Sequence, residues 1–73
     1  MTDKKALENG DEVIIAEGYR GFLQDLGGMK GVVRGKYLFG GKELRYMVYV
    51  YDLDEYIEPT RDKLRLVSEG ESG

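Results

Sequence analysis

The run GGMKGVVRGKYLFGGKELRYMVYVY, residues 27–51, decides the fold. It contains two segments rich in β-branched and aromatic residues, separated by the pair Gly40-Gly41. Two such segments joined by two glycines are typical of a β-hairpin, because a tight hairpin turn needs positive φ, which glycine adopts without strain. The sequence therefore predicts a long central hairpin that turns at Gly40 and Gly41.

The alternation of side chains predicts the register of this hairpin. With the two glycines as the turn, Val33 lies opposite Val48 on the inner face, and Gly35 lies opposite the large Tyr46. A slip of one residue would exchange the inner and outer faces, so the apolar pattern selects this pairing. Glycines in a strand permit strong bending or close approach, and we expect a short, curled barrel.

Outside the hairpin the chain predicts three short strands and one tight helical turn. Asn9-Gly10 is a turn signal ahead of the first strand. Pro59 ends another strand, because proline lacks the amide proton that a central strand donates. In order, we expect a strand over 11–15, an irregular loop over 16–30, the hairpin, a turn over 52–55, a strand over 56–58, a 3₁₀ turn over 59–62 and a strand over 63–67 that pairs with the first.

The loop over 16–30 is punctuated by glycines, which argue against a long helix, although the spacing of its apolar residues fits one helical turn. Its large apolar side chains must pack against something. We expect Phe22 or Leu26 to fold beneath the barrel and Tyr19 to stay nearer the surface. Leu7 is expected to cover one end of the core.

Length and composition bound the architecture. The chain has 73 residues, of which 41% are hydrophobic, and this predicts one domain with a thin core. We expect a flexible N-terminus over 1–6, a folded domain over 7–67 and a disordered tail over 68–73. No apolar signal segment or membrane-length apolar run is present, so we expect a cytoplasmic protein that does not bind membranes.

The order of the expected elements resembles the SH3-like small barrels, including the KOW-type and translation-protein modules. The residues that carry the resemblance are NGDEVII (9–15), GGMKGVV (27–33), YMVYV (46–50) and DKLRLV (62–67). The resemblance implies an all-β, five-stranded small barrel with a long first loop, a central Gly-Gly hairpin and a 3₁₀ turn before the last strand.

For function, the same resemblance implies a binding module, because such barrels bind RNA, DNA, ribosomes, polymerases or peptides. In size and element order the chain is also similar to small stand-alone SH3-like proteins of phages and prophages. It lacks the Ala-Leu-Tyr-Asp-Tyr stretch of signalling SH3 domains. A groove for proline-rich peptides is therefore not implied.

The chain has few of the residue types that catalysis commonly uses. Histidine and cysteine are absent, and the few serine and threonine residues stand mostly near the ends of the chain. We expect no enzyme and no cofactor. An EF-hand loop beginning at Asp52 would need glycine at its sixth position and glutamate at its twelfth, but these are Ile57 and Lys63. We therefore expect no metal site there.

Charge is segregated along the chain, whose net charge is −3. Residues 30–45 hold five basic side chains against one acidic, whereas residues 46–60 hold four acidic side chains and no basic one. The register above places Lys36 opposite Arg45, and like charges facing each other across a strand pair are destabilising. An anionic partner would relieve this repulsion; alternatively, the long side chains splay into water.

Tyrosines provide the second functional signal. Tyr37 and Tyr46 are expected in the core, and the others are expected at the rim, with an exposed aromatic patch or a cage for methylated side chains as the less favoured alternatives. The candidate binding residues are Arg34, Lys36, Lys42, Arg45, Tyr49, Tyr51 and Tyr19.

Three functions stay open on these residues. We favour a non-catalytic binding or regulatory module whose partner is a protein, reached through the outer hairpin face and the loop over 17–30, in machinery that handles nucleic acid. The first alternative is direct binding of RNA or DNA by the basic hairpin. The second is a phage-type inhibitor whose carboxylates imitate phosphates, namely Asp52, Asp54, Glu55 and Glu58. The expected state is a monomer or a weak homodimer, because exposed strand edges can pair.

Overall fold

The protein belongs to the all-β class. A computed structural model describes residues 6–21 and 23–67. Within these residues, seven strands form two antiparallel sheets, and one turn of 3₁₀ helix (η1) precedes the last strand. In chain order the elements are β1 (Glu12–Ile15), β2 (Arg20–Gly21), β3 (Gln24–Asp25), β4 (Lys30–Phe39), β5 (Glu43–Val50), β6 (Glu55–Ile57), η1 (Arg61–Lys63) and β7 (Leu64–Leu66).

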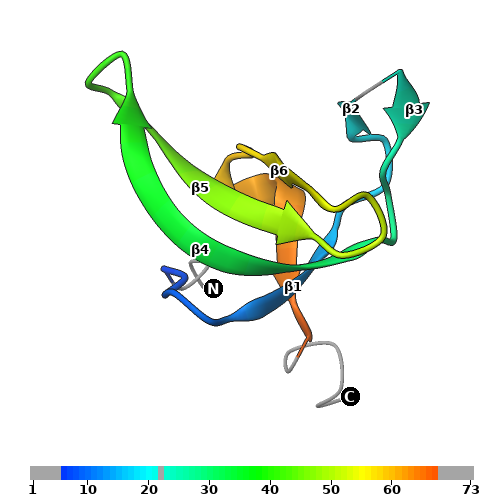
Figure 1. Ribbon diagram of the computed structural model, residues 1–73. Helices are drawn as coiled ribbons and strands as arrows, with labels where there is room; N and C mark the ends of the chain where they lie inside the picture. The colour runs from blue at the N-terminus through cyan, green and yellow to red at the C-terminus, as the bar shows by residue number, and fades with distance from the viewer. Residues whose placement is uncertain (1–5, 22, 68–73) are drawn as a thin grey trace, which may run out of the picture.

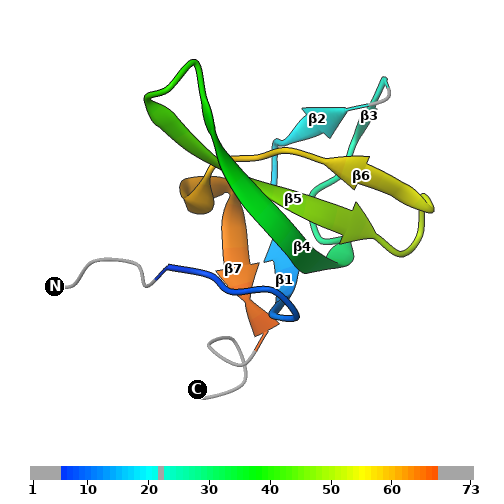
Figure 2. The same ribbon diagram turned by 60° about the vertical axis from the view of Figure 1, so that its left-hand side comes forward.

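The larger sheet has the strand order β6-β5-β4-β1-β7, and every neighbouring pair is antiparallel. β4 and β5 form a long curved hairpin (Figure 1), and the β2–β3 hairpin stands to one side of it (Figure 2). Among the described residues no ladder joins β6 to β7. The N–H of Tyr46 donates to the C=O of Pro59 at 2.9 Å, which ties the segment after β6 back to β5. The sheet is thus curved but open between its edge strands.

The central hairpin is confirmed and it turns at Gly40 and Gly41. However, Phe39 pairs with Glu43, so Lys42 also belongs to the connection, which has three residues in place of the expected two. The N–H of Lys42 donates to the C=O of Phe39 at 3.1 Å, and Gly40 and Gly41 between them have φ of 62° and 76°. The shorter strands expected on either side are also present, each within a residue or two of the expected bounds, and β7 pairs with β1. The 3₁₀ turn occupies 61–63 in place of the expected 59–62.

The expected register holds only in the part of the hairpin away from the turn, at Gly31, Val32 and Val33. Val33 faces Val48 as expected, but the ladder then shifts at Arg34, so that Gly35 faces Met47. The shift is a β-bulge, in which one strand carries an extra residue and bends more strongly. The expected pairing of Gly35 with Tyr46 is therefore wrong, because that pairing requires a ladder without a bulge.

The loop over 16–30 is more regular than expected, because it contains the two-stranded β2–β3 sheet. Leu26 is fully buried, as expected, and Tyr19 is half-buried against the core. A Cβ on Gly27 would lie 2.6 Å from the Cα of Glu17, so glycine is required where the two ends of this loop meet. Phe22 lies outside the described residues.

The core lies on the concave side of the curved sheet. Tyr46 is among its fully buried side chains, whereas Tyr37, also expected there, is half-buried outside it. Among the described residues, the buried hydrophobic side chains are Leu7, Val13, Ile15, Leu26, Val33, Tyr46, Val48, Val50, Ile57, Leu64 and Leu66.

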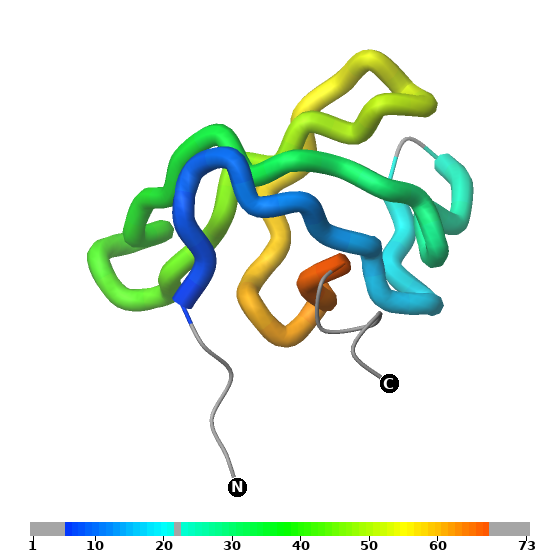
Figure 3. The backbone as a smooth tube through the Cα atoms, turned by 90° about the horizontal axis from the view of Figure 1, so that it is seen from below, coloured from blue at the N-terminus to red at the C-terminus, as the bar shows by residue number. Residues whose placement is uncertain are grey.

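The segment before β1 closes one end of this core. Leu7 is buried as expected, and its N–H donates to the phenol oxygen of Tyr46 at 3.2 Å. The chain then runs alongside β4 (Figure 3), where the N–H of Gly10 donates to the C=O of Val33 at 2.7 Å. The expected flexible N-terminus over 1–6, apart from Ala6, and the expected disordered tail over 68–73 lie outside the described residues, and both stay predictions.

Gly31 of β4 leaves no room for a side chain against β5. A Cβ at this position would lie 2.6 Å from the C=O oxygen of Tyr49 and 2.7 Å from a methyl carbon of Val48. Neither atom has room to move, because the first is backbone and the second belongs to a fully buried side chain. Glycine at residue 31 is therefore a requirement of the hairpin.

We predict that Gly31→Ala lowers the free energy of unfolding by about 1–3 kcal/mol, the usual cost of overpacking a core. Gly35→Ala is the matched control on the same strand, because its Cβ would meet only the Met47 sulfur at an ordinary 3.5 Å. Urea denaturation of both variants measures the difference. Equal stabilities of the two variants would contradict the close approach.

Candidate functional site

The outer face of β4, β5 and β6 carries the largest group of exposed aromatic side chains in the described part of the chain. Alternation along β5 buries Val48 and Val50 and turns Tyr49 outward. Tyr49 pairs with Val32 of β4 on one side and with Tyr56 of β6 on the other. A row of outward residues therefore crosses the three strands.

Three tyrosines form one cluster on this face, which we call the tyrosine triad: Tyr49, Tyr51 and Tyr56. The ring centroids of Tyr49 and Tyr51 lie 5.9 Å apart at an interplanar angle of 77°, and those of Tyr49 and Tyr56 lie 5.4 Å apart at 64°. Such edge-to-face contacts are favourable beyond burial alone. Tyr51 is 46% exposed and Tyr56 is 49% exposed, so the triad is a fixed aromatic surface open to solvent.

Carboxylates orient two of the three phenols. The Tyr49 hydroxyl donates to Oδ1 of Asp54, and the Tyr51 hydroxyl donates to Oε2 of Glu12 at 3.3 Å. The hydrogen bond to Asp54 is the main reason that the pKa of Tyr49 is raised. Partial desolvation and the charge of Glu12 raise the pKa of Tyr51, while the charge of Arg34 opposes this change. Both phenols therefore stay protonated donors at neutral pH.

A second cluster occupies the same face nearer the hairpin turn. The Arg45 guanidinium carbon lies 4.2 Å from the ring centroid of Phe39, and Nε of Arg45 lies 3.5 Å from Oε2 of Glu43. The Tyr37 hydroxyl donates to Oε1 of Glu58 at 2.6 Å, which raises the pKa of Tyr37. Arg45 is thus already engaged within the protein.

Tyr19 belongs to this second cluster and lies apart from the triad. With Arg45 and Glu58 it lines a shallow depression of about 230 Å³. Burial is the main cause that raises the pKa of Tyr19, with Arg45 lowering it and Glu58 raising it. The structure therefore does not bring Tyr19 together with Tyr49 and Tyr51.

The basic candidates do not form one patch. Arg34 is exposed at the bulge and Lys42 is exposed in the turn. Lys36 pairs with Tyr46, whereas Arg45 pairs with Tyr37, so Lys36 and Arg45 project from opposite faces of the hairpin. The expected opposition of Lys36 and Arg45 is wrong, because the bulge shifts the register by one residue.

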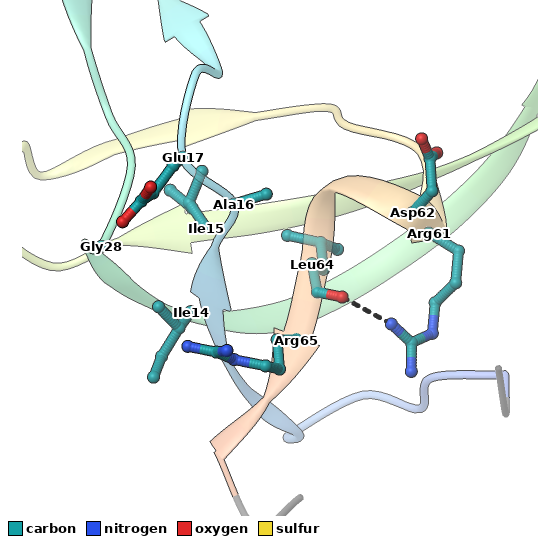
Figure 4. Close-up of a pocket in the computed structure, with 9 residues that line it drawn as sticks. All are labelled: Ile14, Ile15, Ala16, Glu17, Gly28, Arg61, Asp62, Leu64 and Arg65. Atoms are coloured by element: carbon teal, nitrogen blue, oxygen red, sulfur yellow. Dashed lines mark hydrogen bonds between the residues drawn. The ribbon is translucent and has the colours of Figure 1, made fainter. Parts of the chain in front are cut away.

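A cavity with a volume of about 510 Å³ lies beside β1 and β7 (Figure 4). The Arg61 guanidinium donates to the C=O of Leu64 at 2.6 Å. In Figure 4, Arg61 of η1 and Arg65 of β7 extend in different directions, and Arg65 lies beside Ile14. The two guanidinium groups therefore do not converge on one ligand position.

Neither a metal-binding cluster nor a membrane-spanning helix is found among the described residues. No group of three or more aspartate and glutamate side chains in this part of the chain is placed to hold a metal ion. In residues 6–21 and 23–67 we also find no helix with the length and apolar character needed to cross a membrane. Comparison of the chain with protein-family models, curated proteins and solved structures gave no match.

Tyr56 belongs to the triad but is not among the candidate binding residues that the sequence indicated. It reaches the triad because a short turn returns β6 antiparallel to β5, with Tyr56 opposite Tyr49. The signal in the sequence was the spacing around the turn at 51–54, combined with the alternation of the flanking strands.

We predict that Asp54→Asn lowers the pKa of Tyr49 toward its ordinary value, because the negative acceptor of its proton is removed. Asparagine also tolerates the positive φ of 54° at this position, so the turn is preserved. An NMR titration of the tyrosine ring carbons measures the pKa, and Tyr49→Phe assigns the signal. An unchanged Tyr49 pKa in Asp54→Asn would contradict the hydrogen bond.

The raised pKa also predicts how stability depends on alkaline pH. A phenol whose folded pKa exceeds its unfolded value contributes stability that is complete below about pH 10 and is lost as pH rises through the folded pKa. Urea denaturation at increasing pH should therefore show a smaller alkaline loss for Tyr49→Phe than for the unmodified protein. Identical pH profiles would show that Tyr49 contributes nothing to this loss.

Proposed function

We propose that this protein is a non-catalytic binding module with an SH3-like fold, and that it engages a protein partner through the outer face of β4, β5 and β6. Support for the fold comes from the strand order β6-β5-β4-β1-β7, the hairpin in the first long loop and the 3₁₀ turn before β7. The central hairpin, the pairing of β7 with β1 and the 3₁₀ turn match the arrangement expected for SH3-like small barrels, whereas the β2–β3 hairpin was not expected.

The exposed tyrosine triad is the observation that carries the functional proposal. Tyrosine and methionine are enriched in protein interfaces, and Met47, which is also exposed, projects from the same side of β5 as Tyr49. Side chains already held by strand pairing and ring contacts lose little conformational entropy when a partner binds. A rigid aromatic surface on paired strands is therefore well suited to recognition.

Direct binding of RNA or DNA is the second candidate. It is favoured by the charge of Arg34 beside Tyr51, because an aromatic ring next to a cation can stack on a base near a phosphate. It has less support than a protein partner, because Lys36 and Arg45 lie on opposite faces. Phosphate mimicry has less support still, since Asp54 and Glu58 already accept hydrogen bonds from tyrosines.

Affinity capture from the source cell tests the proposal. We expect the unmodified protein to retain a protein partner after nuclease treatment, and the double variant Tyr51→Ala with Tyr56→Ala to lose at least about tenfold in affinity, as for truncation of interface hot spots. The matched control is Leu38→Ala with Leu44→Ala, a cross-strand pair of exposed apolar residues on the other face of the hairpin.

The outcomes separate the candidates. Loss of the partner in the tyrosine variant alone supports the outer face as the interface. Loss in the leucine variant alone would place the interface at the hairpin turn and contradict the proposal. Loss on nuclease treatment would favour nucleic acid, whose affinity should then fall by nearly one log unit per log unit of salt for each phosphate contacted.

A further inference from the structure

The tyrosine triad lies in the most acidic part of the chain. Residues 46–60 contain four carboxylates and no basic side chain, and Asp52, Asp54 and Glu55 in the turn beside the triad are all exposed. Glu12 of β1 adds a fourth carboxylate beside the triad, hydrogen-bonded to Tyr51. These carboxylates outnumber Arg34, whose positive charge acts on Tyr51, so the aromatic surface attracts cations more than anions.

The rings themselves reinforce this preference. The face of an aromatic ring carries negative potential, and a cation within about 6 Å of the ring centroid is attracted to it. The centroids of Tyr51 and Tyr56 lie 5.9 Å and 5.4 Å from that of Tyr49, so one cation above the triad can approach more than one ring. Asp54 already accepts one hydrogen bond, but a carboxylate has about four acceptor positions and can accept more.

Elsewhere on the same face, the chain itself places a guanidinium against an aromatic ring and a carboxylate. There the Arg45 guanidinium lies 4.2 Å from the Phe39 ring centroid while its Nε lies 3.5 Å from Glu43. A guanidinium satisfies an aromatic ring and a carboxylate together, because it is planar and carries several donors at its edge. The triad offers the same two kinds of group, and within residues 6–21 and 23–67 no arginine lies over its rings as Arg45 lies over Phe39.

We propose that the tyrosine triad, with Asp54 and Glu12, is the docking site for an arginine-bearing basic segment of the protein partner. This inference rests on the proposed function and specifies the partner's chemistry. The guanidinium packs on the exposed rings and donates to the remaining acceptor positions of the two carboxylates. A nucleic acid is disfavoured at this position, since its phosphates would approach the carboxylates of the acidic turn.

Binding of short synthetic peptides tests this assignment. The probe is a flexible Gly/Ser peptide with two arginines, and its matched control carries citrulline, the neutral isostere, at both positions. We expect the arginine peptide to bind at low salt, to shift the NMR signals of the triad rings, and to bind at least tenfold more tightly than the citrulline peptide. Equal affinities, or no binding of either peptide, would overturn the proposal.

Variants locate the peptide on the surface. The double variant Asp54→Asn with Glu12→Gln should weaken the arginine peptide about tenfold, and Tyr56→Leu should weaken it while Tyr56→Phe retains it. Glu58→Gln is the matched control, because its carboxylate binds Tyr37 and lies outside the triad. If Glu58→Gln lost as much affinity as the double variant, the effect would come from the overall charge of the protein. The proposed site would then be wrong.

The peptide assay and the affinity capture test separate claims, so either claim can fail without the other. If the arginine and citrulline peptides bind equally while Tyr51→Ala with Tyr56→Ala still loses the cellular partner, the outer face is an interface but not a site for arginine. If the leucine variant alone loses the partner while the arginine peptide still binds the triad, the proposed interface is wrong, although the triad does select a guanidinium.

Discussion

The close contact between β4 and β5 at Gly31 is the constraint on which the rest of the structure depends. The missing side chain there admits the Tyr49 carbonyl and the Val48 methyl group, and this fixes which residues of the two strands face each other. Once Val48 is inside, alternation places Tyr49 outside, and β6 then brings Tyr56 beside it. The buried core and the aromatic outer surface are therefore two results of one register.

Sequence reasoning recovered the elements that depend on local signals. Gly40-Gly41 indicated the turn, Pro59 the end of β6, and the alternation of Leu64 and Leu66 the last strand. It missed the bulge at Arg34, which turns Tyr37 and Phe39 to the outer face, because Tyr37, Leu38 and Phe39 are all apolar and their order does not show which of them face the core. It also missed β2 and β3, since strands of two residues owe their existence to packing of the loop and not to their own propensity.

The sequence predicted the kinds of residue in the candidate site better than it predicted their arrangement. The basic residues drew attention because they are clustered along the chain, but the bulge separates Lys36 from Arg45 and Glu43 already pairs with Arg45. The tyrosines gather because strand pairing places Tyr49 beside Tyr56 and Tyr51 follows directly after β5, and the carboxylates of Asp54 and Glu12 orient two of the hydroxyls. The acidic and aromatic signals, distinct in the sequence, thus belong to one surface.

The register of the β4–β5 hairpin is the central claim, and cross-strand nuclear Overhauser effects measure it most directly. The account predicts contacts of Val33 with Val48 and of Gly35 with Met47, together with contacts between the ring protons of Tyr49 and Tyr56. Contacts of Gly35 with Tyr46, with no contact between the rings of Tyr49 and Tyr56, would mean an unbroken ladder without the bulge. That result would contradict both the fold described and the aromatic surface built on it.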